Sequence, residues 1–190
     1  IDEGLFKFLD ELQLITAKPV IYVCNVDESS VINGNEHVDN VKELVANENA
    51  EILVLGAGIE SDIAEPDDFE ERKMFLDDLG LEEAGVSKLI KNAYSLLKLQ
   101  TYFTAGEKEV RAWTIKKGMT APQAAGVIHT DFEKGFIKAE VIKFSDFVNF
   151  GSESSVKEAG KLMIQGKEYV VNDGDVMPVS YTHLRAHETR

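Results

Sequence analysis

The feature that most constrains the fold is a short apolar run followed by polar residues. Residues 20–24 are continuously apolar and rich in β-branched and aromatic side chains, which is typical of a strand buried on both faces of a parallel sheet. Asn25-Val26-Asp27-Glu28 follows directly. Ligands of open α/β sheets bind just beyond the carboxyl ends of the strands. The amide of Asn25 and the carboxylate of Glu28 are therefore predicted to lie where such a sheet reads a ligand.

A second strand is predicted after a helix. Residues 36–48 carry apolar side chains at helical spacing, and residues 51–55 form another apolar run. The order strand, helix, strand indicates a βαβ unit with a right-handed crossover. Gly56-Ala57-Gly58 comes next, where small residues let backbone N–H groups approach a ligand closely. We therefore expect an α/β fold with a parallel sheet in the first half of the chain.

The tetrapeptide at residues 25–28 resembles the base-reading loop of P-loop GTPases, whose pattern is Asn-Lys-x-Asp. Val26 stands at the Lys position and Glu28 at the Asp position. The Asp carboxylate of that pattern accepts two hydrogen bonds from guanine, whereas adenine presents an acceptor at N1, and a site rejects a base that leaves its polar groups unpaired. Glu28 is also one methylene longer. The resemblance implies a loop that does not favour guanine; the alternative is an ordinary polar turn.

The loop at residues 56–58 gives a weaker signal. P-loop GTPases have a Ser-Ala-Lys loop at this place, and its backbone touches the base. Only Ala57 matches that loop. The alternative interpretation is a plain strand-to-loop turn.

The charge and the cysteine content limit the kinds of partner and compartment that suit this chain. The net charge of −14 and the pI near 4.7 argue against bulk nucleic-acid binding, DNA included, but leave room for a local basic patch. Cys24 is the only cysteine, so no disulfide forms within the chain, which suits a reducing cytosol. No apolar run approaches the roughly 20 residues that cross a bilayer. The acidic residues between 67 and 78 lack metal-ligand spacing, and we interpret them as a solvated face.

From about residue 100 the pattern changes to short strands with few helices. The predicted elements are strands at residues 102–105, 109–115 and 135–142, a helix that begins at Ala121 after the cap Thr120, a hairpin of residues 162–165 with 169–171, and the extended pair Val176-Met177. This order indicates an α+β module like a ubiquitin-type β-grasp.

Several side chains in this half are candidates for contact with a partner. Five basic residues are predicted to form a local face that binds RNA or ribosomal protein: Arg111, Lys116, Lys117, Lys134 and Lys138. The alternative is charge scattered over alternating strands. We interpret His129 as a capping or surface residue rather than an acid–base group. Trp113 is interpreted as a core residue rather than a platform for base stacking.

Residues 102–142 carry a longer resemblance. They begin Tyr-Phe-Thr-Ala-Gly-Glu-Lys-Glu-Val-Arg-Ala-Trp-Thr-Ile and continue through Ala-Pro-Gln-Ala-Ala-Gly-Val-Ile-His-Thr-Asp-Phe-Glu-Lys-Gly-Phe-Ile. This nearly ungapped stretch resembles the TGS domain of the YchF-type Obg-like ATPases, a family with Asn-x-x-Glu in its base-reading loop. The resemblance extends over residues 1–178. It implies a helical segment returning from a missing coiled-coil domain at residues 1–17, the C-terminal part of a G domain at 18–99, a TGS domain at 100–178, and a non-native tail at 179–190.

The resemblance also implies a function. Family members are cytoplasmic, ribosome-associated P-loop proteins that prefer ATP to GTP and use Mg²⁺. In this chain the implied nucleotide contacts are the amide of Asn25 to adenine, backbone and apolar contact from Val26, discrimination against guanine by Glu28, and a base edge near Gly56, Ala57 and Gly58.

Two departures from the family limit these expectations. The phosphate loop Gly-x-x-x-x-Gly-Lys-Ser/Thr is not in the sequence, and neither are the switch loops with the Mg²⁺ ligands and the catalytic residue. Phosphoryl transfer depends on those parts, so we expect no ATP hydrolysis by this chain alone. The alternative function is a nucleotide-independent RNA- or ribosome-binding module. Residues 179–190 resemble a cloning scar in place of the family's closing strand, a loss that would leave the partner strand unpaired.

Overall fold

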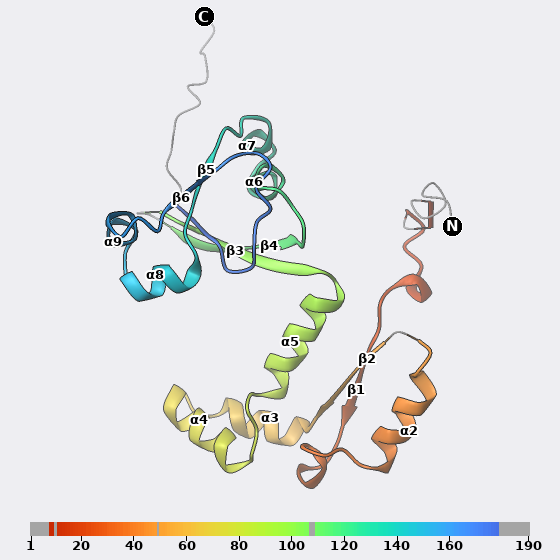
Figure 1. The fold of residues 1–190 in the computed structure, drawn as a ribbon. Helices are drawn as coiled ribbons and strands as arrows, with labels where there is room; N and C mark the ends of the chain where they lie inside the picture. Colours follow the sequence, from red (N-terminus) through yellow and green to blue (C-terminus); the bar gives the residue numbers. More distant parts are fainter. Residues whose placement is uncertain (1–7, 10, 49, 107–108, 179–190) are drawn as a thin grey trace, which may run out of the picture. The chain divides into compact units, whose positions relative to one another are not determined.

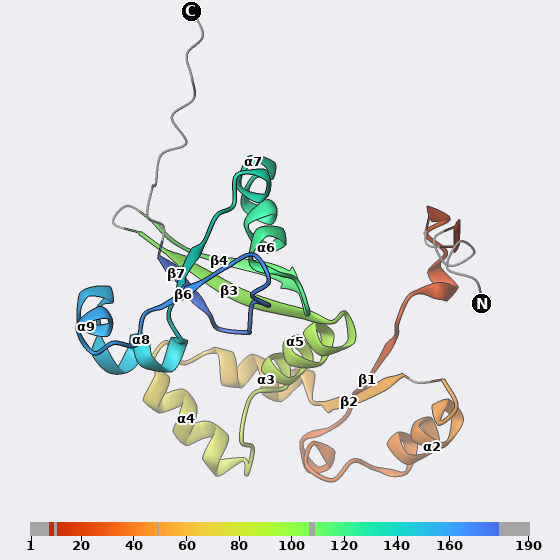
Figure 2. The same cartoon turned by 45° about the horizontal axis from the view of Figure 1, so that its top comes forward.

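The computed structural model describes residues 8–9, 11–48, 50–106 and 109–178. The chain divides between Leu97 and Lys98 into two compact units, each with its own sheet structure (Figure 1, Figure 2). The predicted tail at residues 179–190 and the first seven residues of the predicted N-terminal helix lie outside the described residues. Within the described ranges, no helix is both long enough and apolar enough to cross a membrane.

The first unit contains the predicted βαβ arrangement. β1 (Ile21–Asn25) pairs in parallel with β2 (Glu51–Leu55), so that Asn25 lies opposite Leu55. α2 (Glu36–Val45) connects the two strands, and it ends earlier than predicted. Its N-terminus is capped by Asn35, whose Oδ1 accepts a hydrogen bond from the Val38 N–H at 3.1 Å. The parallel sheet predicted for this half of the chain is confirmed.

Three helices follow β2: α3 (Ala57–Ala64), α4 (Phe69–Asp78) and α5 (Gly85–Leu96). Ile59 and Ile63 of α3 are buried together with Leu81, which follows α4. α4 lies within the acidic stretch, and its carboxylates are exposed. The described residues contain no group of three or more His, Cys, Asp or Glu side chains arranged to hold a metal ion.

The second unit is organised around β3 (Leu99–Ala105). β3 pairs antiparallel with β4 (Val110–Lys116) on one side and parallel with β7 (Val176–Pro178) on the other. β5 (Ala139–Val141) pairs antiparallel with β6 (Met163–Gln165). A bridge between Ile142 and Val176 joins the two groups of strands. The strands therefore follow one another in the order β4, β3, β7, β5, β6.

Helices pack against both faces of this sheet. They are α6 (Ala121–Ile128), α7 (Thr130–Lys134), α8 (Phe144–Phe150) and α9 (Glu153–Glu158). One apolar cluster joins Tyr102 and Ile115 to Ala124 of α6, and the Tyr102 hydroxyl donates to the Ala124 carbonyl at 2.9 Å. Another joins Ile142 to Val156 of α9. Successive side chains of a strand point to opposite faces, which lets β3 contribute to both clusters.

The predicted hairpin is wrong. Ala121 donates its N–H to the Tyr169 carbonyl at 2.7 Å, and Val171 donates to the Met119 carbonyl at 3.0 Å. These bonds hold residues 169–171 against the start of α6, so β6 pairs with β5 instead.

One strand prediction differs from the structure, and another concerns residues that the structure does not describe. The strand predicted at residues 135–142 shortens to Ala139–Val141, because Gly135 still belongs to the end of α7. The closing strand predicted to be lost after Met177 falls on residues outside the described ones; within them, β7 pairs with β3 at Phe103–Ala105.

Candidate functional site

The structure brings the two predicted loops of the first unit together at the carboxyl ends of β1 and β2. Asn25 is the last residue of β1, and its Oδ1 accepts a hydrogen bond from the Ala57 N–H at 2.8 Å. The Val26 N–H donates to the Leu55 carbonyl at 2.9 Å. A side-chain bond and a backbone bond thus tie the loop after β1 to the loop after β2.

Gly56, Ala57 and Gly58 do not form the plain turn that the sequence allowed. Gly56 is the N-cap of α3, and Ala57 and Gly58 are exposed in its first turn. A Cβ at Gly56 would lie 2.9 Å from Val31 Cγ2, so only glycine fits this buried position. A Cβ at Gly58 would meet nothing within 4 Å. The backbone of the first turn is therefore open to a ligand.

Glu28 lies three residues beyond the strand, in a short 3-10 turn (Glu28–Ser30), and its side chain is exposed. Its neighbour Asp27 is held locally instead. Hydrogen bonds from the side chains of Ser30 and Ser29 lower the pKa of Asp27, and the Ser29 hydroxyl donates to Asp27 Oδ1 at 2.9 Å. Of the two adjacent carboxylates, Glu28 is the one whose side chain extends from the turn without such a partner among the described residues.

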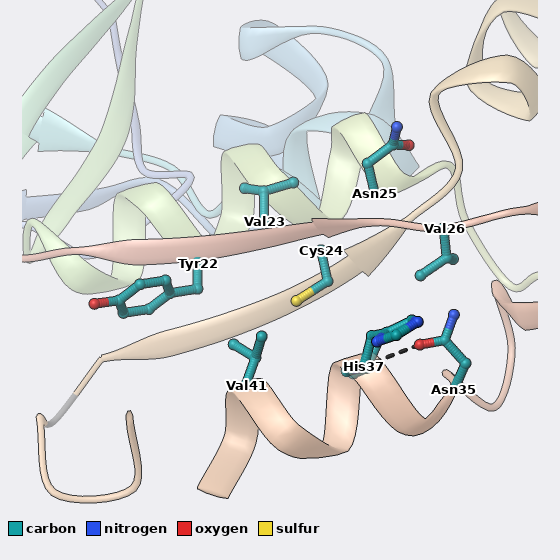
Figure 3. A pocket seen from close by; sticks show the side chains of 9 residues that line it. Tyr22, Val23, Cys24, Asn25, Val26, Asn35, His37 and Val41 are labelled. Carbon is teal, nitrogen blue, oxygen red and sulfur yellow. Dashed lines mark hydrogen bonds between the residues drawn. The ribbon is translucent and has the colours of Figure 1, made fainter. Parts of the chain in front are cut away.

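A pocket of about 320 Å³ runs from this loop along β1 (Figure 3). In Figure 3 the side chains of Tyr22, Cys24 and Val26 point toward α2, whereas Val23 and Asn25 point to the other side of the strand. The pocket is lined by Tyr22, Val23, Cys24, Asn25, Val26, Asn35, His37, Val38 and Val41. Glu28 and residues 56–58 are not in its lining. The predicted base-contacting residues thus lie at one end of the pocket and beyond it.

One contact at this corner joins residues that are far apart in the sequence. The Glu60 carboxylate of α3 accepts the Gly85 N–H at 2.6 Å and the Val86 N–H at 3.0 Å, at the start of α5. Its partners are 25 and 26 residues away along the chain. Periodicity and local capping patterns compare near neighbours, so no sequence signal indicated this pair.

The five predicted basic residues of the second unit are all exposed, but they do not share one face. Arg111 and Lys116 lie on opposite faces of β4, since their positions differ by an odd number. The guanidinium of Arg111 lies 4.2 Å from the centroid of the Trp113 ring. Lys117 donates its N–H to the Lys98 carbonyl at 2.7 Å, which adds Lys98 to Lys116 and Lys117 at one end of the β3–β4 pair.

The interpretations of Trp113 and His129 are confirmed. Trp113 packs against the cluster of Tyr102 and Ile115, and its indole N–H donates to Thr104 Oγ1 at 2.9 Å. His129 is the exposed N-cap of α7, where its Nδ1 accepts the Asp131 N–H at 3.2 Å. Lys134 ends α7, and Lys138 lies just before β5.

Comparison with known proteins gives consistent matches over nearly the whole chain. A family model named YchF-GTPase_C, described as a protein of unknown function (DUF933), matches residues 99–181. The "Ribosome-binding ATPase YchF" of Bacillus subtilis is 55% identical over 173 residues, which cover 90% of this chain and 47% of the relative. The protein of that name from Haemophilus influenzae is 52% identical over 177 residues, covering 93% and 48%. "Obg-like ATPase 1" of Xenopus laevis is 46% identical over 172 residues, covering 89% and 43%.

A solved structure, described as the Schizosaccharomyces pombe YchF GTPase, superposes with a TM-score of 0.77 at 35% identity, over 93% of this chain and 47% of that one. The chain therefore spans about half the length of the relatives it matches. Sequence and fold agree on the same relatives across both units. The chain belongs to the family of YchF-type Obg-like ATPases, over a region that corresponds to about half of those proteins.

Proposed function

We propose that this chain is the base-reading and ribosome-contacting part of a cytoplasmic, ATP-preferring P-loop nucleotide hydrolase. The observation that carries the proposal is the 2.8 Å bond between Asn25 Oδ1 and the Ala57 N–H. It unites two loops at the edge of a parallel sheet where ligands of α/β folds bind. The relatives named ribosome-binding ATPases and Obg-like ATPase support the same function.

Adenine suits the groups at this corner better than guanine does. With Oδ1 of Asn25 occupied by Ala57, the Nδ2 amide group is left to donate to a ring nitrogen of the base. The side chain of Val26 points to the opposite side of the strand from that of Asn25 (Figure 3), so the amide of Asn25 carries the proposed contact with the base. The side chain of Glu28 is exposed and one methylene longer than the Asp of GTPases, so it does not reproduce their guanine clamp and the preference for guanine is lost.

The residues described here fit the base of ATP but not its phosphates or Mg²⁺. The sequence has no Gly-x-x-x-x-Gly-Lys-Ser/Thr loop. The described residues also contain no acidic or histidine cluster able to hold a metal. We propose that this chain binds the base without hydrolysing ATP by itself, because the groups that stabilise phosphoryl transfer are not among its residues.

We propose further that residues 100–178 form a TGS domain with a β-grasp fold. The strand order β4, β3, β7, β5, β6 supports this assignment, as do the parallel contact between the first and last strands of the unit and the helix α6 after the first hairpin. It also agrees with the boundary between Leu97 and Lys98.

Charge distribution favours this second unit as the ribosome-binding part. Residues 1–97 contain 7 Lys and Arg against 22 Asp and Glu, a net charge of −15, whereas residues 98–190 contain 13 against 12. An acidic surface is repelled by RNA phosphates, so contact with ribosomal RNA falls to the second unit. Lys98, Lys116 and Lys117, which lie together, are the best candidates. This observation also favours the second candidate function, ribosome binding without nucleotide.

Titration with adenosine and guanosine, followed by amide NMR, tests the base-reading proposal. We expect adenosine to shift the signals of residues 25–28 and 56–58 at millimolar concentration, and guanosine to bind about tenfold more weakly or not at all. Equal shifts with both nucleosides, or no shift with adenosine, would contradict it. We also expect the purified chain to show no measurable ATP hydrolysis. Measurable hydrolysis would contradict the proposal that the reaction needs groups that are not among the residues of this chain.

Co-sedimentation with ribosomes tests the partner surface. The triple change Lys98→Glu, Lys116→Glu and Lys117→Glu is expected to move the chain into the supernatant, and more so at higher salt. Lys73→Glu, an exposed charge reversal on α4 of the first unit, serves as the matched control. Binding that survives the triple change would reject this surface. Binding without any response to adenosine would favour the nucleotide-independent function.

A further inference from the structure

A side chain outside both predicted loops holds the base-reading corner to the helix that ends the first unit. Glu60 lies in the first turn and a half of α3, and its N–H donates to the Gly56 carbonyl at 3.0 Å. It is therefore one helical turn from Gly56, within the helix that begins with Ala57. Any shift of Glu60 along or around this short helix also shifts Ala57.

Both carboxylate oxygens of Glu60 are used at the N-terminus of α5. Oε1 accepts from Gly85 at 2.6 Å and Oε2 from Val86 at 3.0 Å. The first N–H groups of a helix have no partner within the helix, and a negative charge there is stabilised by the helix dipole. The N-cap of α5 is Ala84, which cannot cap with its side chain, and no acidic residue occupies the first turn of α5. Glu60 of α3 therefore provides the hydrogen-bond acceptors and the negative charge that the N-terminus of α5 lacks in its own sequence.

The packing around Gly85 leaves little freedom at this contact. Gly85 is buried, and a Cβ on it would lie 2.7 Å from Glu60 Oε1 and 2.9 Å from Leu55 Cβ. Leu55 is the residue before Gly56, and its carbonyl accepts the Val26 N–H. The start of α5 is thus pressed against the end of β2 while it is bonded to α3.

These contacts join four chain segments at one corner: Asn25 bonds to Ala57, Val26 bonds to Leu55, Leu55 lies against Gly85, and Gly85 bonds to Glu60. We propose that Glu60 is a positioning residue for base recognition, which sets the place of Ala57 and, through it, the orientation of the Asn25 amide. This inference rests on the proposed reading of adenine at Asn25. A positioning residue acts through another residue and makes no contact with the base itself.

Three variants of the full chain test the proposal. Glu60→Ala removes both acceptors, Glu60→Gln keeps one oxygen acceptor for Gly85, and Asp62→Asn removes a charge from an exposed position on the same helix without touching α5. The measured quantities are the affinities for adenosine and guanosine, the amide NMR signals of Ala57, Gly85 and Val86, and the unfolding midpoint.

We expect Glu60→Ala to weaken adenosine binding about tenfold, the effect of losing a charged hydrogen bond at the corner, and to reduce the preference over guanosine. The Ala57 signal should move together with those of Gly85 and Val86. Glu60→Gln is expected to recover most of the affinity, and Asp62→Asn to match the unchanged chain. If Glu60→Ala does not fold, Glu60→Gln carries the test, with a loss of about threefold from its one missing acceptor.

The outcomes separate this inference from the function on which it rests. If the unchanged chain binds no adenosine, the proposed function fails. If it binds adenosine and Glu60→Ala lowers the unfolding midpoint but leaves both affinities unchanged, Glu60 only caps α5 and the positioning role is wrong. An unchanged Ala57 signal in Glu60→Gln and Glu60→Ala would also overturn it.

Discussion

The Nζ atom of Lys143 lies 2.7 Å from Oδ1 of Asp175, whose side chain is completely buried. Oδ2 of Asp175 accepts the Tyr169 hydroxyl at 2.7 Å and the Asn172 N–H at 2.9 Å. Both oxygens are satisfied, as a buried charge requires. Lys143 follows Ile142, just after β5, and Asp175 precedes β7, so this ion pair holds the start of β7 to the segment that follows β5.

We expect Asp175→Ala to lower the free energy of unfolding of the second unit by about 3 kcal/mol, because it removes one partner of a buried pair and leaves several donors unpaired. Asp175→Asn should lower the free energy of unfolding less, because the amide oxygen of Asn can still accept a hydrogen bond from one of these donors. Trp113 is the only tryptophan of the chain and lies in this unit, so its fluorescence in urea reports the transition. Glu168→Ala, an exposed carboxylate nearby, is the control. Equal midpoints for Asp175→Ala and Glu168→Ala would contradict the prediction.

The same pair predicts a pH dependence. Burial lowers the pKa of Lys143, but hydrogen bonds to Asp175 and Tyr169 and their charges outweigh it and raise the pKa above its usual 10.5. A raised lysine pKa contributes its full stability below the unfolded value, and the contribution is lost as the pH rises through the folded value. The difference in unfolding midpoint between the unchanged chain and Lys143→Met should therefore be constant near neutral pH and shrink above 10.5. A difference that stays constant there would contradict it.

Two glycines of the first unit should respond to alanine in opposite ways. Gly85→Ala places a Cβ within 3 Å of Glu60 and Leu55, so we expect a loss of about 2 kcal/mol in the free energy of unfolding. Gly58→Ala meets no atom within 4 Å and lies in a helix, so we expect a gain of about 0.5 kcal/mol. Thermal unfolding followed by circular dichroism measures both. A gain in Gly85→Ala would show that the crowding there is relieved by movement, and a loss in Gly58→Ala would contradict the expectation for that position.

Substitution of Asn25 separates its structural role from its proposed binding role. Asn25→Asp keeps an oxygen that accepts the Ala57 N–H but loses the amide donor, whereas Asn25→Ala loses both. We expect Asn25→Ala to lower the free energy of unfolding by about 1 kcal/mol and Asn25→Asp to change it little. Both should weaken adenosine binding about tenfold. Unchanged adenosine affinity in Asn25→Asp would assign the amide to structure alone.

Features that depend on near neighbours in the chain could be read from the sequence. The apolar run at residues 20–24 and the helical spacing after Asn35 gave the βαβ unit, since strand and helix periods and the Asn35 cap act within a few residues. The same holds for Thr120 at the start of α6, where Gln123 Oε1 accepts the Thr120 N–H at 2.9 Å. The proximity of Asn25 and Ala57 followed from the rule that parallel strands end at one edge.

Only the tertiary structure decided the contacts between segments distant in sequence. Residues 169–171 are turned away from β6 by backbone bonds to Met119 and Ala121, and this choice depends on about 50 intervening residues of folded chain, not on hairpin propensity. Glu60 with Gly85, and Lys143 with Asp175, are separated by 25 and 32 residues. Such partners are selected by close packing and by the cost of leaving buried polar groups unpaired, neither of which a local pattern contains.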